Sequence, residues 1–439
     1  MPRNLSIVVW CLFIVSTTSY ANEPYHIAVQ PENLSTMFTQ LYGSNGLIVD
    51  SLAVLPSGDT HSAHFNSDFQ TEFTQFTTAL TSRLAAVPLP SPASGFTYEF
   101  DSSLGVFSRT TQSFGPVLAE RAETIGKHRF SFGFTYQHFN FDTLEGNDLG
   151  NIPAVFTHDS AELRGGREDL VTTVNSVTAS INQFTIFLTY GLTDRLDVSL
   201  AAPMMSNELQ IVSHATVQRI GTESEDIHFF READDSLGEQ RVFNASGSAS
   251  GIGDLTVRLK GNFWRAGGLS FGLDLRVPTG DEHNLLGVGA AGAKPFLIWS
   301  THFEGFSPHV NAGYQWNGKT VLAGDPNTGE AKKLQDQAFF TAGADFGVGS
   351  RFTFAFDILG NYFIDTPRMQ RTEFQALNGV SFFPDITFVT DSFLVLNGAV
   401  GCKINVAGEV LLDFNLLFNL NDNGLQDKVT PLIGMEYSF

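Results

Sequence analysis

Between residues 251 and 317, apolar and polar side chains alternate in three successive runs that are separated by turn-forming segments. In the first run, Leu255, Val257 and Leu259 share one side, whereas Arg258 and Lys260 share the other. Successive side chains of a β-strand point to opposite faces, so this spacing predicts strands with one apolar and one polar face. The other two runs cover residues 269–277 and 308–317.

The length of these runs favours a membrane protein over a soluble sandwich, in which strands also alternate. Strands of globular proteins have roughly five to six residues, whereas a tilted membrane-spanning strand needs about 9–11. The apolar face of the third run ends in Tyr314 and Trp316, a position typical of the aromatic girdles at bilayer interfaces. The fold class we predict is all-β, a transmembrane antiparallel up-and-down β-barrel.

Composition agrees with a barrel. Of the 439 residues, 16% are charged, against about 25% in ordinary globular proteins. Phe and Gly, with 41 residues each, suit lipid-facing strand positions and tight turns. The net charge of −21 argues against nucleic-acid binding, which depends on basic surfaces.

The chain divides into three parts. Residues 1–21 resemble a signal peptide, with Arg3, an apolar stretch and Ala21 before the expected cleavage site, so export to the bacterial outer membrane is expected. Removal of this part would leave Cys402 as the single cysteine. Residues 22–92 carry apolar side chains at helical spacing and predict a short helical plug or a periplasmic segment. Residues 93–439 form the predicted barrel of about fourteen strands, with twelve as an alternative, because the first two (96–107 and 114–123) are weakly patterned.

Connections between the predicted strands alternate between short and long; residues 364–392, between strands expected at 352–363 and 393–404, are predicted as one of the long loops. Short turns face the periplasm and long loops face outward in outer-membrane barrels. One long loop, residues 222–239, is strongly acidic. It could hold divalent cations or serve only as a solvated loop.

We find no motif for catalysis, and we expect no catalytic, cofactor or metal site. Gly-x-Ser-x-Gly and His-Glu-x-x-His are absent. His61 and His64 have no obvious third metal ligand. An outer-membrane hydrolase would require a Ser or Asp beside one of the histidines in three dimensions.

If the apolar faces contact lipid, the charged side chains of the strands point into the lumen. There they could set the selectivity of a pore or form an ion-pair network that only rigidifies the barrel. Arg258 and Asp274 are expected to pair across neighbouring strands. Phe296 and Ile298 break the polar pattern and hint at a partly apolar interior. The candidate lumen-lining residues are Arg258, Lys260, Asp274, Arg276, Lys294, Asp345, Asp357 and Asp413.

The last strand ends in Tyr437 and Phe439 on its apolar side. It resembles the final strand of bacterial outer-membrane barrels, where this pattern is the signal for the barrel-insertion machinery. We therefore expect that machinery, outer-membrane lipid and lipopolysaccharide as partners of a monomeric protein.

A more specific resemblance rests on Gly251-Ile252-Gly253-Asp254-Leu255, residues 272–282, and residues 286–287 with 289–296. They are similar to the outer-membrane barrels of the phenol meta-cleavage-pathway (transporter-like) family, distant relatives of the long-chain fatty-acid transporters. The resemblance implies a passive channel for small hydrophobic or aromatic compounds and a small hydrophobic ligand as a further partner. The alternative is a structural or adhesive barrel without transport.

Overall fold

The computed structural model describes residues 26–29, 31–43, 47–49, 64–66, 69–91, 95, 98–101, 106–109, 113–158, 169–220, 228–232 and 234–439. The predicted signal peptide and residues 222–227 of the acidic loop lie outside these ranges. Among the described residues, no helix has the length and apolar character needed to cross a membrane.

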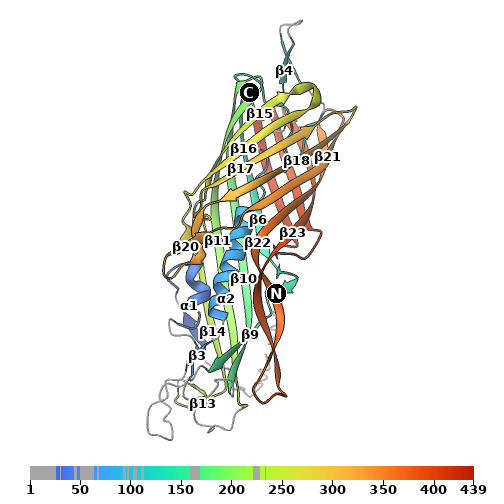
Figure 1. Cartoon of the computed structure of the whole chain (residues 1–439). Coiled ribbons are helices and arrows are strands. Elements are labelled where there is room, and N and C mark those ends of the chain that lie inside the picture. The colour runs from blue at the N-terminus through green and yellow to red at the C-terminus, as the bar shows by residue number, and fades with distance from the viewer. Residues whose placement is uncertain are drawn as a thin grey trace, which may run out of the picture.

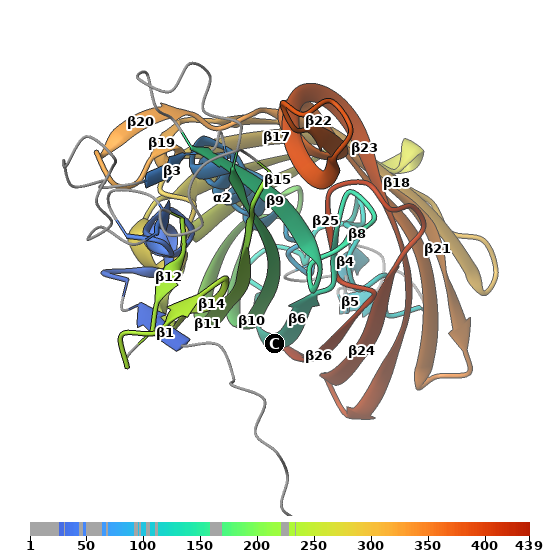
Figure 2. The same ribbon diagram turned by 90° about the horizontal axis from the view of Figure 1, so that it is seen from below.

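Within the described residues, twelve wall strands form a closed antiparallel barrel, as Figures 1 and 2 show. The last strand pairs with the first, with Tyr437 opposite Phe132, which closes the wall. Two segments, β14 and β15, both pair with β11 and together make one wall strand. The wall consists of β6 (Phe130–Phe141), β10 (Leu170–Thr193), β11 (Leu196–Gln218), β14 (Gln240–Ile252) with β15 (Leu255–Trp264), β16 (Leu269–Val277), β17 (Gly292–Ser300), β18 (Phe306–Asn317), β21 (Gln337–Val348), β22 (Phe352–Gln375), β23 (Phe382–Ala407), β24 (Val410–Asn419) and β26 (Val429–Ser438).

The smaller elements lie around this wall. Strands β1, β2, β3 and β9 extend the same sheet, and the others form small separate sheets. They are β1 (His26–Val29), β2 (Leu47–Ile48), β3 (His64–Asn66), β4 (Tyr98–Asp101), β5 (Val106–Arg109), β7 (Thr143–Leu144), β8 (Asn147–Asp148), β9 (Ile152–His158), β12 (Phe230–Arg231), β13 (Leu237–Gly238), β19 (Lys319–Asp325), β20 (Glu330–Lys333) and β25 (Leu425–Gln426). The helices are η1 (Leu34–Thr36), α1 (Met37–Gln40), α2 (Phe69–Ala85), η2 (Arg265–Gly267) and η3 (Glu282–Asn284).

The predicted all-β barrel is confirmed with the smaller of the two strand counts. Residues 96–107 and 114–123 are not wall strands: β4 pairs with β5 in a separate sheet, and residues 113–125 run through the interior. A second correction concerns residues 364–392, which were expected to form a loop. They continue the β22–β23 hairpin, whose strands have 24 and 26 residues. At about 3.3 Å per residue such strands reach roughly 80 Å, far beyond the thickness of a bilayer.

Exposure along the strands is the reverse of that in a soluble protein. On β15, Leu259 is 37% exposed, whereas Arg258 and Lys260 beside it are 9% and 4% exposed. The same holds on β16 and β17, where Phe271 and Leu297 face outward. An apolar outer belt around a polar interior is the arrangement that a lipid environment stabilises.

The barrel has a short-turn end, where residues 194–195, 265–268, 301–305, 349–351 and 408–409 connect the strands, and an opposite long-loop end. Helices α1 and α2 lie inside the barrel toward the long-loop end (Figures 1 and 2). There Met37, Phe38 and Leu41 join a core with Ile181 and Leu209 of the wall. The inner face of the wall is therefore apolar where the helices lie and polar toward the short turns.

The C-terminal residue completes the barrel seam. Backbone N–H groups of Phe130 and Phe439 each donate to the other's carbonyl oxygen, at 2.9 and 2.8 Å. The rings of Tyr437 and Phe439 stack with centroids 5.3 Å apart and lie half-exposed on the outer surface.

We expect the double variant Tyr437→Ala, Phe439→Ala to assemble poorly, because it removes the aromatic side chains expected to be recognised during insertion. The measurement is the fraction of heat-modifiable, folded barrel in outer-membrane preparations. Phe382→Ala, which removes an equally exposed ring from the hairpin beyond the barrel, is the control. Equal folded fractions for the two variants would contradict the prediction.

Candidate functional site: the barrel interior and its central cavity

Alternation places the charged side chains of β15, β16, β17 and β21 inside the barrel, where most of them are buried. Arg258 and Asp274 sit opposite each other in the β15–β16 ladder. They form a bidentate pair, with Nε to Oδ1 at 2.6 Å and Nη2 to Oδ2 at 2.7 Å. This is the pair expected from the sequence. Two parallel charge-assisted hydrogen bonds make it geometrically rigid.

Residues 113–125, which we call the inner segment, fill the lumen toward the short-turn end. Glu120 accepts a hydrogen bond from Arg258 and another from Lys260 Nζ at 3.3 Å. Its backbone N–H donates to Asn311 Oδ1 at 2.7 Å, and Asn311 Nδ2 donates back to the Glu120 carbonyl at 2.9 Å. The inner segment is thus attached to the wall by side chains and not by a strand ladder.

A second ionic contact holds the same segment on another part of the wall. Arg121 Nη2 lies 3.1 Å from Asp345 Oδ1 of β21, and both side chains are buried. The predicted apolar positions Phe296 and Ile298 pack against Ala122. Removing one partner of a buried ion pair leaves an unpaired buried charge and costs about 3–5 kcal/mol, so these contacts lock the segment in place.

The carboxyl group of Glu120 belongs to the inner segment and not to the membrane-spanning wall. Burial raises its pKa, but Lys260 and Arg258 favour the carboxylate more strongly, and the net pKa is below the usual value for glutamate. Glu120 therefore stays charged over the neutral range and well into the acidic range.

Three other predicted interior residues pair away from the Arg258 cluster. Asp345 and Asp357 flank His309, with Nε2 to Asp357 Oδ1 at 2.6 Å and Nδ1 to Asp345 Oδ2 at 3.5 Å. Asp413 lies 3.9 Å from Lys403 Nζ. The hydrolase hypothesis required a Ser or Asp beside a histidine, and His309 has two. Both of its ring nitrogens face carboxylates in a buried site, where His309 forms an ionic cluster with Asp345 and Asp357.

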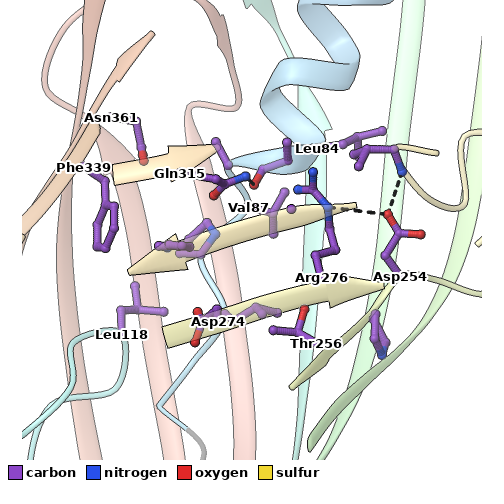
Figure 3. Close-up of a pocket in the computed structure, with 18 of the residues that line it drawn as sticks. Leu84, Val87, Leu118, Asp254, Thr256, Asp274, Arg276, Gln315, Phe339 and Asn361 are labelled. Atoms are coloured by element: carbon purple, nitrogen blue, oxygen red, sulfur yellow. Dashed lines mark hydrogen bonds and ion pairs between the residues drawn. The ribbon is translucent and has the colours of Figure 1, made fainter. Parts of the chain in front are cut away.

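Arg276 and Lys294, the last two predicted residues, border a cavity of about 150 Å³ midway along the barrel. Arg276 Nε donates to the Ala290 carbonyl at 3.1 Å, and Nη2 donates to Asn317 Oδ1 at 2.7 Å. The ammonium of Lys294 lies over the ring of Phe339, 3.9 Å from its centroid. In Figure 3, Arg276 and Asp254 lie on one side of the cavity and Phe339 and Leu118 on the other.

Two segments that precede the wall in the sequence line this cavity. Residues 84–89, at and beyond the end of α2, line it toward the long-loop end, and Leu118 and Glu120 of the inner segment line it toward the short turns. The cavity therefore lies inside the barrel between the wall and two parts of the same chain that are not part of the wall.

Sequence reasoning missed Glu120 and Arg121, because it placed residues 114–123 in the wall. The sequence nevertheless contains evidence against a wall strand at residues 114–123. Pro116 interrupts the stretch, and Glu120 and Arg121 are adjacent charges that would have to face both lipid and lumen in a strand. Among the described residues, no cluster of three or more His, Cys, Asp or Glu side chains is arranged to hold a metal ion.

A closed antiparallel barrel with an apolar outer belt, a polar inner face and a central cavity defines a channel-like barrel of the outer-membrane class. Within that class, the chain belongs to the family described as "Putative MetA-pathway of phenol degradation", whose sequence profile matches residues 164–391, just over half of the chain.

Solved structures with a similar fold include three bacterial proteins. An outer-membrane channel from Pseudomonas putida F1 has 16% identity and a TM-score of 0.45 over 74% of this chain and 100% of that chain. A FadL homologue from Pseudomonas aeruginosa has 8% identity and a TM-score of 0.32 over 71% and 89%. The translocator domain of the autotransporter NalP from Neisseria meningitidis has 9% identity and a TM-score of 0.29 over 72% and 89%. No curated protein matches the chain.

Proposed function

We propose that this protein is a monomeric channel of the bacterial outer membrane that lets small hydrophobic or aromatic compounds cross passively. The central cavity is the observation that carries the proposal. It lies inside the barrel and has both apolar and polar lining, which is typical of binding sites for small organic molecules. The family description, which refers to phenol degradation, supports an aromatic cargo.

Transport through this cavity requires movement of the inner segment, because that segment blocks the lumen toward the short turns. The contacts of Glu120 and Arg121 are side-chain contacts, and they can be broken without opening the strand ladder of the wall. A gate of this kind leaves the barrel closed to lipid while it admits cargo.

Purified full-length protein is expected to give small conductance steps in planar bilayers, and cells that carry it should take up benzyl alcohol faster than cells lacking the gene. A silent barrel together with unchanged uptake would contradict the proposal and favour the structural or adhesive alternative.

Filling the cavity provides the sharper test. Thr341 is buried and lines the cavity, so Thr341→Trp would place an indole ring in most of the available space. We expect benzyl alcohol uptake to fall to the level of cells without the protein. Ala342→Trp is the matched control, because the next residue of β21 points to the outer face. Folding of both variants is checked by heat modifiability, and equal uptake by two folded variants would contradict the proposal.

A further inference from the structure

The three carboxylates that line the central cavity, those of Glu120, Asp254 and Asp274, already have hydrogen-bond partners. Asp274 uses both carboxylate oxygens on Arg258. Glu120 uses one oxygen on Arg258 and the other on Lys260. Asp254 accepts from the backbone N–H groups of Gly280 at 3.0 Å and Val288 at 2.9 Å. A ligand that brings hydrogen-bond donors finds few free carboxylate positions in this cavity.

The hydrogen-bond donors that line the cavity differ from these acceptors, and the ammonium group of Lys294 is the clearest case. Within the part of the chain that the structure describes, no carboxylate lies within ion-pairing distance of its ammonium. The ammonium instead lies over the ring of Phe339. Asp274 is its partner across the β16–β17 ladder, but that carboxylate is held by Arg258. An ammonium group has three N–H donors, so Lys294 can bind an oxygen that a ligand brings.

The size and walls of the cavity limit the rest of such a ligand. A volume of about 150 Å³ is that of apolar cavities known to hold benzene. Phe296 and Phe339 meet edge to face, with ring centroids 5.8 Å apart, and Leu84, Val87 and Leu118 complete an apolar surface. A single ring fits this space, whereas a long acyl chain would have to extend out of it.

We propose that the cavity is a binding site for single-ring aromatic carboxylates, with the carboxylate on Lys294 and the ring between the apolar side chains and the Phe296–Phe339 pair. The assignment rests on the proposed function and specifies its cargo. Arg276 lines the same cavity and adds a second positive charge; its guanidinium donates to the Ala290 carbonyl and to Asn317 Oδ1 and lies 3.9 Å from Asp254.

Isothermal titration of the detergent-solubilised full chain with benzoate, benzyl alcohol and octanoate tests the assignment. Wild type should bind benzoate more tightly than benzyl alcohol, which has the same ring without the charge, and more tightly than octanoate, which has the charge without the ring. Lys294→Met should weaken benzoate binding by about tenfold or more, the loss expected for a charge-assisted contact, and leave benzyl alcohol within about twofold.

Lys332→Met is the matched control, because Lys332 is 61% exposed on β20 and lies outside the cavity; it should change neither affinity. An equal loss of both aromatic ligands in Lys294→Met, unchanged benzoate binding, or a preference for octanoate would overturn the assignment. Titration needs no transport, so a barrel that binds benzoate but passes no cargo would refute the proposed function while the binding site stands.

Discussion

Replacing Glu120 with glutamine is expected to raise the conductance of the channel strongly, with many more open events in planar bilayers. The substitution keeps the shape of the side chain but removes the charge that holds the inner segment to Arg258 and Lys260. Loss of one partner of a buried pair costs about 3 kcal/mol or more, which shifts the balance between attached and detached segments by roughly 100-fold. The open probability of single channels measures this shift.

Glu330→Gln is the control, because Glu330 is 62% exposed on β20 and pairs with Lys332, which is not part of the inner segment. Acid offers an independent check. Because the folded pKa of Glu120 is depressed, its contribution to attachment is present above the ordinary pKa of glutamate and is lost as the pH falls through the lowered value. Wild type should therefore open only at strongly acidic pH. If Glu120→Gln conducts like wild type at neutral pH, the inner segment is not the gate.

Phe38→Ala is expected to loosen the helices at the long-loop end without opening the wall. Phe38 is 1% exposed and packs on Phe76 of α2 with ring centroids 4.6 Å apart. Truncation of a buried phenylalanine to alanine costs about 3–5 kcal/mol. Hydrogen exchange of the α2 amides should accelerate by roughly 100-fold or more, since each 1.4 kcal/mol corresponds to a factor of ten.

Amides of the wall strands report the specificity of this effect and should exchange at wild-type rates, because the closed ladder does not depend on the helices. Glu32→Ala, at an exposed residue just before η1, should leave α2 unchanged. Uniform acceleration in helices and wall alike would show that the helices and the barrel unfold as one unit, contrary to the prediction.

Much of the wall could be predicted from alternation alone. Residues 269–277 form β16 with the predicted bounds, and the predicted strand at 352–363 begins β22 at the correct residue. The periodicity is informative there because one face of each strand contacts a uniform apolar surface. Beyond the bilayer that constraint disappears, and the extensions of β22 and β23 carry exposed and half-buried residues without a clear apolar face. Their hairpin was therefore predicted as a loop.

Alternation alone does not predict which groups contact the inner face of the wall. The side chains of Arg258, Lys260 and Asp274 are buried, and Arg258 pairs with Asp274 across neighbouring strands. The pattern could not show that Glu120 joins this pair from 138 positions away in the sequence, or that Lys294 borders a cavity with no carboxylate of the described residues at ion-pairing distance.

By itself, the amino-acid sequence determined that long strands with an apolar side would close into a barrel, because unpaired backbone groups cannot remain in lipid. Only the tertiary structure decided what occupies the lumen. A polar strand face is equally compatible with water, with a cargo or with a protein segment that carries matching charges. The choice depends on contacts between residues far apart in the chain, which periodicity does not encode.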